Sequence, residues 1–514
     1  MLSLIITALL SYGYFIVKET ITIDSLSNDR YNSGILFAQG RLISPLISKI
    51  FMEQTNNYSF TNIFGLLLIM LSVIIICCVF EKIFKPKTIV PAVAFSCVYV
   101  SYPLNFEYYD FSGSLLLSGF CMCLLSVSLY LILTKKSKFE RFYLPLILLA
   151  LMESSYETFT FAFVCLVCIC LIPLVTDKCD LKNKIGYLIH SAIVVVCALV
   201  VEYIISTSAI SLRGVEQDYH ADKNIFWFEA SFLEGIKTLF KSFVLFWNSK
   251  VFCYLPFTIL FVAGVIFTAI FIGEITKKSN NKLAVLLSYG AVFASIFAFF
   301  VVKGGSCCYR GETTFPVFVG FVMYLLLLKT ENKKSVIKGI CIAFVGVLIL
   351  SQAMSCDYWN RLQNRAYNAE KQVICTVDMI VTERYGKSKP VVFIGAYQLP
   401  DDIKEKDQIK DNTIAKRIYD FGLKMEGRLF YNAEYKITDT KMRSYLAWAE
   451  KPFNAPNEEI YKFAEYHGCY FVHAQKQQYY EAVERYSDLP SWPDKQSVFD
   501  AGDYIVVKLG DVKE

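Results

Sequence analysis

Long apolar runs recur along the first two-thirds of this 514-residue chain and stop in the last third. They span roughly 17 to 25 residues, the length that a helix needs to cross a hydrocarbon core about 30 Å thick. Apolar residues make up 55% of the chain and charged residues only 19%, which is atypical of soluble domains. The pattern predicts a polytopic α-helical membrane protein with about eleven transmembrane helices.

The apolar run from 142 to 175 contains a polar string at 153–158. One helix of that length would reach ~50 Å, too long for a single crossing, so we expect two short helices joined by a turn. The predicted spans are Leu2–Val17, Thr61–Phe80, Ile89–Tyr102, Gly113–Leu133, Phe142–Glu153, Phe159–Val175, Ile185–Ser206, Tyr254–Ile275, Leu283–Val302, Phe315–Leu328 and Ile340–Met354.

Lysine and arginine residues mark every second short loop, which predicts that these loops face the cytoplasm. The basic loops are 82–87, 135–141, 178–184, 277–282 and 329–338. An odd number of spans with the amino terminus inside would place residues 24–41, and everything after about Asp357, on the external face of the inner (plasma) membrane. A cleaved signal peptide is the alternative for the first segment, but that segment lacks a basic start and a small-residue cleavage site.

The chain divides at Cys356 into a predicted transmembrane domain, residues 1–356, and a small extracytoplasmic α/β domain, residues 357–514. Beyond this point the apolar runs end and shorter amphipathic patterns follow. The predicted elements of this domain are helices Tyr358–Tyr385, Glu458–Tyr466 and Lys476–Tyr486 and strands Val391–Ile394, Tyr470–His473 and Tyr504–Lys508.

The first external loop carries two carboxylates, Asp24 and Asp29, and two arginines, Arg30 and Arg41. A carboxylate can remove a proton from an acceptor hydroxyl, and a guanidinium binds phosphate oxygens through a bidentate fork. The alternative is a solvated loop in which these charges only pair with one another, since surface ion pairs are common and weak. The loop therefore contains a candidate base and candidate phosphate ligands.

Other predicted outer turns also carry ionisable or aromatic residues close to the membrane, where unpaired charge is costly and often functional. The candidate substrate-binding residues are Glu107, Asp110, Tyr156 and Glu157, and the further candidate phosphate ligands are Lys303 and Arg310. The alternatives are a helix cap for Glu107 and Asp110, a packing role for Glu157 and a membrane anchor for Lys303. The long outer segment 207–253 includes a predicted interfacial amphipathic helix, Phe226–Phe246.

No metal or cofactor site is predicted, although a divalent metal is left open. Cys165, Cys168 and Cys170 lie inside an apolar span, where thiols act as small packing residues. His467 and His473 lack a paired nucleophile and are interpreted as structural. The formal charge of +5 comes from the lysine loops that would meet anionic lipid, so no nucleic-acid partner is needed.

The chain resembles the Gtr-type serotype-converting glucosyl transferases, polytopic enzymes of the GT-C glycosyltransferase class. The resemblance rests on the first loop from Asp24 to Arg41, on Tyr109-Asp110 before a long helix, on Ser155-Tyr156-Glu157 where such proteins often have Tyr-Gln, and on the closing segment 489–507. It implies a polyprenyl-phosphate-linked sugar donor, commonly glucose. The acceptor would be a surface polysaccharide, such as the O-antigen of a bacterial cell envelope, or its lipid-linked precursor.

The resemblance makes Asp24 the leading catalytic carboxylate and Asp29 the second. It also implies inversion of configuration at the anomeric carbon of the sugar, through a single displacement. Two other functions would use the same surface: a flippase or transporter of lipid-linked sugars, and a polysaccharide polymerase. Transporters usually show internal repeats and ionisable groups near the midplane, and neither pattern is evident here.

Overall fold

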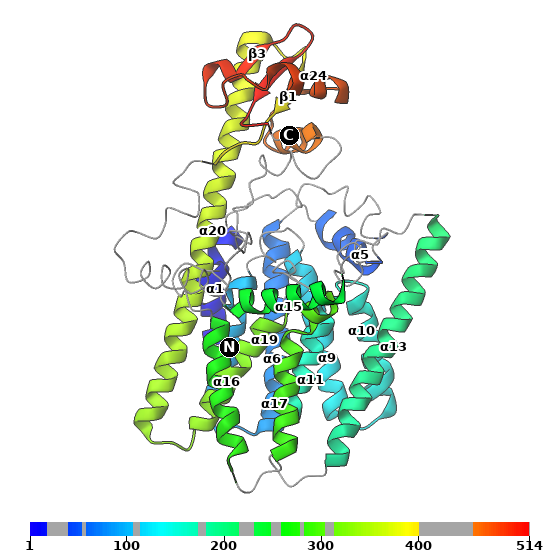
Figure 1. Cartoon of the computed structure of the whole chain (residues 1–514), viewed down its shortest axis with the longest axis vertical. Coiled ribbons are helices and arrows are strands. Elements are labelled where there is room, and N and C mark those ends of the chain that lie inside the picture. Colours follow the sequence, from blue (N-terminus) through cyan, green and yellow to red (C-terminus); the bar gives the residue numbers. More distant parts are fainter. Residues whose placement is uncertain are drawn as a thin grey trace.

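A bundle of helices and a small terminal sheet are joined by one long helix in the computed structural model (Figure 1). The structure describes residues 1–17, 37, 40–53, 58–105, 114–172, 181–214, 231–247, 259–277, 282–303, 313–399 and 456–512. The bundle comprises α1 (Leu2–Val17), α6 (Tyr58–Phe84), α7 (Val90–Val100), α9 (Ser114–Thr134), α10 (Leu144–Glu153), α11 (Phe159–Leu171), α13 (Leu181–Arg213), α16 (Ile259–Ile275), α17 (Lys282–Ile296), α18 (Ala298–Lys303), α19 (Thr314–Thr330) and the first part of α20 (Ser335–Tyr385).

Every apolar range predicted as a span contains a helix, and the run from 142 to 175 contains two, α10 and α11, as expected. Within the described residues, four helical segments are long and apolar enough to cross a membrane: Ser59–Phe84, Leu115–Thr134, Gly186–Arg213 and Ser335–Asp357. The other apolar helices of the bundle are shorter. The total of eleven crossings therefore stays a prediction, while the membrane character follows from these four.

Helices α6 and α9 approach so closely at Gly65 and Gly119 that neither position has room for a side chain. A Cβ atom at Gly119 would lie 2.5 Å from the Gly65 carbonyl oxygen, and one at Gly65 would lie 2.7 Å from the Leu116 nitrogen. Small residues allow this contact in lipid, where helices associate through close packing rather than through the hydrophobic effect. The two glycines therefore set the distance between these helices.

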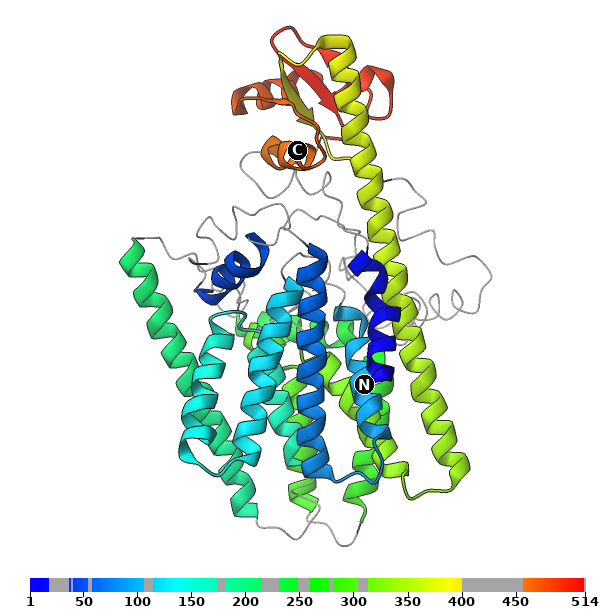
Figure 2. The same ribbon diagram turned by 180° about the vertical axis from the view of Figure 1, so that it is seen from behind.

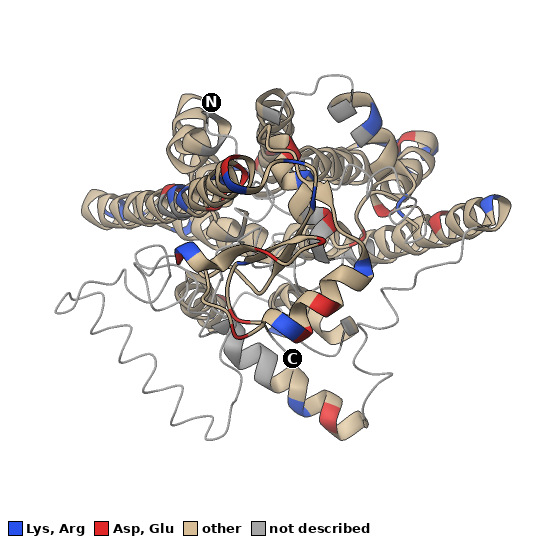
Figure 3. Cartoon of the chain, turned by 90° about the horizontal axis from the view of Figure 1, so that it is seen from above, with Lys and Arg blue, Asp and Glu red and all other residues tan. Residues whose placement is uncertain are grey.

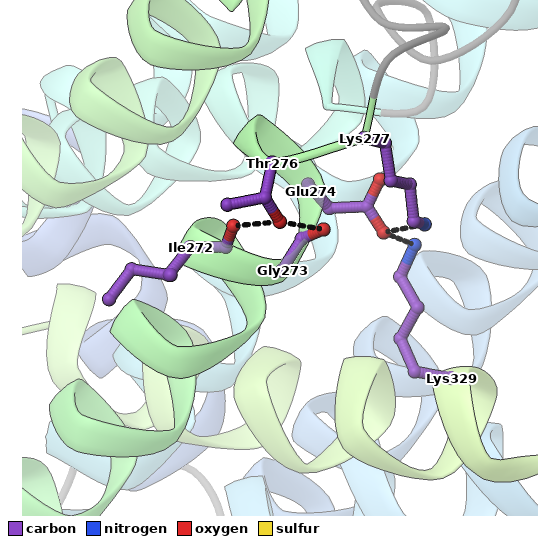
Figure 4. A network of polar contacts seen from close by, with 6 residues as sticks. All are labelled: Ile272, Gly273, Glu274, Thr276, Lys277 and Lys329. Carbon is purple, nitrogen blue, oxygen red and sulfur yellow. Dashed lines mark hydrogen bonds and ion pairs between the residues drawn. The ribbon is translucent and has the colours of Figure 1, made fainter.

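Described residues from three of the basic loops contact one another at one end of the bundle. Glu274, near the end of α16, accepts hydrogen bonds from Lys277 at 2.8 Å and from Lys329 of α19 at 2.6 Å (Figure 4). Glu331, just beyond α19, accepts a backbone hydrogen bond from Lys87 at 3.0 Å. Lys87, Lys277 and Lys329 are thus near one another, as is expected for basic loops on one side of a membrane.

Helix α20 is continuous over 51 residues, about 77 Å at the usual rise. The sequence predicts two elements here, Ile340–Met354 and Tyr358–Tyr385. The structure joins them, and polar residues just beyond the gap pack against α1: the Asn360 amide donates to the Ser11 carbonyl at 3.0 Å, and the Tyr14 hydroxyl donates to Asn364 at 3.1 Å. Figure 2 shows α1 alongside α20.

The C-terminal end of α20 leads into a four-stranded sheet with the order β2-β1-β4-β3, formed by β1 (Pro390–Ile394), β2 (Val472–His473), β3 (Val498–Asp500) and β4 (Ile505–Lys508). Strand β1 is parallel to β2 and β4, and β3 is antiparallel to β4. Helices α23 (Pro456–Tyr466) and α24 (Lys476–Tyr486) complete the layer. The predicted strands and helices are present, while the short β3 was not predicted. Figure 3 shows basic and acidic residues interspersed over this region.

Helix α15 (Phe232–Trp247) lies across the bundle, roughly perpendicular to its long helices (Figure 1). Phe232, Leu233 and Phe240 are among its exposed apolar side chains. The predicted amphipathic helix Phe226–Phe246 overlaps it. An interfacial position at the lipid headgroups fits both its direction and its exposed apolar residues.

His467 is enclosed by aromatic rings in the terminal domain. Its ring centroid lies 4.8 Å from that of Phe463 and 5.5 Å from that of Tyr367. Burial, together with the positive charge of Lys371, lowers the pKa of His467 to about 4. A neutral imidazole is therefore part of the folded domain, which agrees with the structural interpretation of this residue.

Acidification is expected to destabilise the terminal domain through His467. Between pH ~6.5 and pH ~4 the unfolded chain binds a proton at this residue and the folded chain does not, so the free energy of unfolding falls as the pH falls. The His467→Phe variant should lose less thermal stability between pH 7.5 and pH 5, measured on the full chain in detergent. His473→Phe, which removes an exposed ring, is the control; equal pH dependence in both variants would contradict the assignment.

Candidate functional site

Most of the sequence-predicted site residues lie outside the described residues: Asp24, Asp29, Arg30, Glu107, Asp110 and Arg310. The backbone of Lys303 ends α18, but its side chain is not described. Arg41, Tyr156 and Glu157 are described, and the structure brings these three together. They come from two predicted outer turns that are more than one hundred residues apart in the chain.

Arg41 holds Glu157 through a two-point ion pair. Its Nη2 donates to Oε1 of Glu157 at 2.9 Å, and its Nε donates to Oε2 at 3.2 Å. The guanidinium carbon also lies 4.7 Å from the centre of the Tyr156 ring. The fork and the ring together fix the orientation of the guanidinium plane, which a single hydrogen bond would not do.

Two hydrogen bonds to backbone carbonyls hold the segment after Arg41 against the turn that contains Tyr156 and Glu157. The Ile43 amide donates to the Ser154 carbonyl at 3.2 Å, and the Ser44 hydroxyl donates to the Ser155 carbonyl at 2.7 Å. Residues Ile43–Ser48 form α5 directly after Arg41, and residues 154–158 form the turn between α10 and α11. The position of Arg41 therefore depends on hydrogen bonds from Ile43 and Ser44 as well as on its own side chain.

A third segment predicted to be external contacts the same turn through Thr313. Its hydroxyl donates to the Thr158 carbonyl at 3.0 Å, and the Thr314 hydroxyl donates to the Ile296 carbonyl at 2.9 Å. Both threonines stand at the start of α19, at the end of the segment that contains Arg310. We call the contacts among Arg41, residues 154–158 and Thr313 the outer junction.

Two acids near the outer junction were missed by the sequence analysis. Glu153 is buried at the end of α10, where the negative charges of Glu157 and Glu202 repel its carboxylate. Gly40, with φ at +81°, passes so close to α13 that a Cβ there would lie 3.7 Å from Oε1 of Glu202. Both acids lie within predicted spans, near the ends that face this junction. An ionisable residue inside an apolar span is itself a signal for function.

The second predicted outer turn is tied to α1 and α20 near its described start. The Tyr12 hydroxyl donates to the Tyr102 carbonyl at 3.2 Å, and the Ser101 hydroxyl donates to the buried Gln352 of α20 at 2.8 Å. Asn105 donates from its amide to the Tyr99 carbonyl at 2.7 Å. These bonds position the chain just before Glu107 and Asp110.

Metal-binding clusters are not found among the described residues, where no group of three or more histidine, cysteine or acidic side chains has suitable geometry. Cys165, Cys168 and Cys170 are buried free thiols in α11. They pack within the apolar core of the bundle, in line with the predicted packing role.

Comparison with known proteins decides the family. A family model described as glucosyl transferase GtrII matches residues 13–355, about two-thirds of the chain. The chain belongs to this family. The matched residues run from the end of α1 to the apolar half of α20 and include the outer junction. No curated protein matches the chain.

Membership of a glucosyl transferase family gives the outer junction a chemical context. Sugar transfer needs a group that compensates the negative charge of the leaving group and a carboxylate that accepts a proton. The outer junction supplies an oriented guanidinium, an aromatic face and the carboxylate of Glu157, and Glu153 and Glu202 lie near it. These are the residue types from which such a site is built.

Proposed function

We propose that this protein transfers glucose from a polyprenyl-phosphate donor to a surface polysaccharide, or to its lipid-linked precursor, on the external face of the membrane. The terminal domain then lies outside the cytoplasm. The outer junction is the observation that carries the proposal, since it joins three predicted external segments within a glucosyl transferase family member. The position of the outer junction supports this assignment, because α5 lies toward the end of the bundle from which α20 extends to the terminal sheet (Figures 1 and 2).

Arg41 is the proposed ligand of the donor phosphate. The two-point geometry that holds Glu157 at 2.9 and 3.2 Å also matches two oxygens of a phosphate. A partly exposed ion pair contributes little to stability, about 1 kcal/mol or less, so an incoming phosphate could replace the carboxylate at low cost. Glu157 would keep the guanidinium oriented until the donor binds, and Tyr156 would support its plane or the sugar ring.

The donor would be held by its lipid tail in the bilayer, with its phosphate at the depth of the outer junction. Fixing the anomeric carbon against the acceptor hydroxyl would supply much of the rate enhancement through proximity. Asp24, or in second place Asp29, is proposed as the base that accepts the hydroxyl proton. Arg30, Arg310 and Lys303 are further proposed phosphate ligands, and Glu107 and Asp110 are proposed acceptor contacts.

Asp24→Asn is expected to lower sugar transfer about 10²- to 10⁴-fold, because the amide cannot accept the proton that a positioned base removes. The purified variant would be incubated with a panel of polyprenyl-phosphate sugars and polysaccharide, and the product measured by mass spectrometry. Asp500→Asn is the control, since Asp500 pairs with Lys389 on the terminal sheet at 2.6 Å.

Unchanged transfer in both Asp24→Asn and Asp29→Asn would exclude a base in the first loop. With wild-type protein, absence of transfer from every donor, together with movement of lipid-linked sugar between leaflets, would favour a flippase. Formation of longer polysaccharide chains from repeat units would favour a polymerase. Abundance of each variant in the membrane must equal that of the wild type.

A further inference from the structure

Two cysteines from distant parts of the chain meet in the terminal domain. Cys375 lies on the outer half of α20, and Cys469 follows α23, 94 residues later. Their sulfur atoms are 3.6 Å apart. Both are free thiols in the structure, with Cys469 buried and Cys375 half-buried. A sulfur pair at this distance needs only a small shift to reach the S–S bond length of about 2.05 Å.

The surrounding packing holds both cysteines in place. Cys469 lies in the apolar core of the domain together with Val373, Ile374 and Phe463, and Cys375 packs against that core. The chain reverses after α23 through hydrogen bonds from the amides of His467 and Cys469 to the Ala464 carbonyl, both 2.9 Å long. The two cysteines are therefore held by α20 and by the hydrogen-bonded turn that follows α23.

We propose that Cys375 and Cys469 form a disulfide in the mature protein, which fastens the globular part of the terminal domain to α20. The inference rests on the external location given under the proposed function, because disulfides form and persist outside the cytoplasm. Each thiol loses one proton and one electron as the S–S bond forms. The electron pair passes to the disulfide of a thiol oxidase or of oxidised glutathione, which is reduced to two thiols.

The bond is expected to form while the domain folds. Burial raises the pKa of Cys469 to about 12, so its thiolate, which is the attacking species, is scarce once the domain is packed. After formation the same burial shields the bond from reducing thiols. The bond would close a loop of 94 residues, and cross-links across long loops stabilise most by restricting the unfolded chain.

Peptide mapping of the full-length protein tests the pair directly. Membranes would be treated with an alkylating reagent before lysis to trap free thiols, and the purified protein digested with trypsin without reductant. Peptides 372–384 and 463–476 each contain one cysteine. The expected result is one cross-linked species, lighter by two hydrogen atoms than the two peptides together, that separates on reduction.

Variants give a second measurement. Cys375→Ser and Cys469→Ser should each lose the cross-linked species and unfold at a lower temperature than the wild type, and wild type treated with reductant should approach the same temperature. Cys341→Ser is the matched control, because Cys341 is a half-buried free thiol on the apolar part of the same helix. It should retain both the cross-link and the thermal stability.

The sidedness of the domain is measured separately, with Tyr480→Cys on the exposed face of α24 and a membrane-impermeant maleimide. If peptides 372–384 and 463–476 are found alkylated and not cross-linked, the proposed disulfide is overturned, whichever side of the membrane the domain occupies. Free thiols with labelling from outside overturn the disulfide and leave the external location standing. Labelling only after permeabilisation overturns the external location too. A disulfide from Cys375 to any cysteine other than Cys469 overturns the pairing.

Discussion

Replacing Arg41 with alanine is expected to lower sugar transfer about 10²- to 10³-fold, the usual cost of removing one positioned donor from developing negative charge. The loss should be largest at low donor concentration, because Arg41 is proposed to bind the donor phosphate before the reaction as well as during it. Arg41→Lys should recover only part of the activity, since an ammonium keeps the charge but not the fork. Initial rates over a range of donor concentrations measure both effects.

Two controls separate phosphate binding from a structural role of Arg41. Arg361→Ala removes an arginine with similar surroundings, paired with Asp357 at 2.8 Å and placed over the Tyr14 ring, and should leave transfer unchanged. Glu157→Gln breaks the ion pair but introduces glutamine, the residue that the family resemblance implies after Tyr156. The variant should therefore keep most of the activity. If Glu157→Gln and Arg41→Ala lose equal activity, Arg41 serves only to hold Glu157.

Gly119→Ala is expected to destabilise the bundle by about 1 to 3 kcal/mol, the range found when atoms are forced into a packed interior. Alanine has a higher helix propensity than glycine, so helix propensity cannot explain a loss of stability. Any such loss comes from the steric clash. The new Cβ would lie 2.5 Å from the Gly65 carbonyl oxygen, and a backbone oxygen cannot move aside as a flexible side chain can. Gly119→Leu should abolish the yield of monodisperse protein in detergent.

The matched control is Gly290→Ala on α17, where no described atom outside the local helix lies within 4 Å of the added Cβ. It should leave the unfolding temperature unchanged or raise it slightly through helix propensity. A fall of the same size in both variants would show that the contact between α6 and α9 tolerates a methyl group. The close approach of these helices would then have no energetic consequence.

The membrane helices were predictable because their signal is local. An apolar run of sufficient length must form a helix in lipid, since every backbone polar group has to be bonded within the segment. The polar string from Glu153 to Thr158 likewise showed that one run contained two helices. The amphipathic pattern after Lys476 and the short run of β-branched residues before Lys508 also lie within single elements, so α24 and β4 could be located from them.

Elements whose limits depend on distant residues were not predictable. Helix α17 ends at Ile296, where the sequence predicts an uninterrupted span to Val302; the Ile296 carbonyl instead accepts the hydroxyl of Thr314 from another helix. Helix α20 continues past Asp357 because α1 satisfies Asn360 and Asn364. Strand β3 is too short for an alternating pattern and exists through its pairing with β4.

The sequence by itself determined that this is a membrane protein with basic loops on alternate connections, and its motifs indicated the glucosyl transferase family, because length, hydropathy and charge act locally. It also identified Arg41, Tyr156 and Glu157 as separate candidates. Only the tertiary structure decided that these three residues touch, that Glu153 and Glu202 lie near them, and that Cys375 faces Cys469. Such contacts depend on the way helices cross, which is decided by packing between residues far apart in the chain.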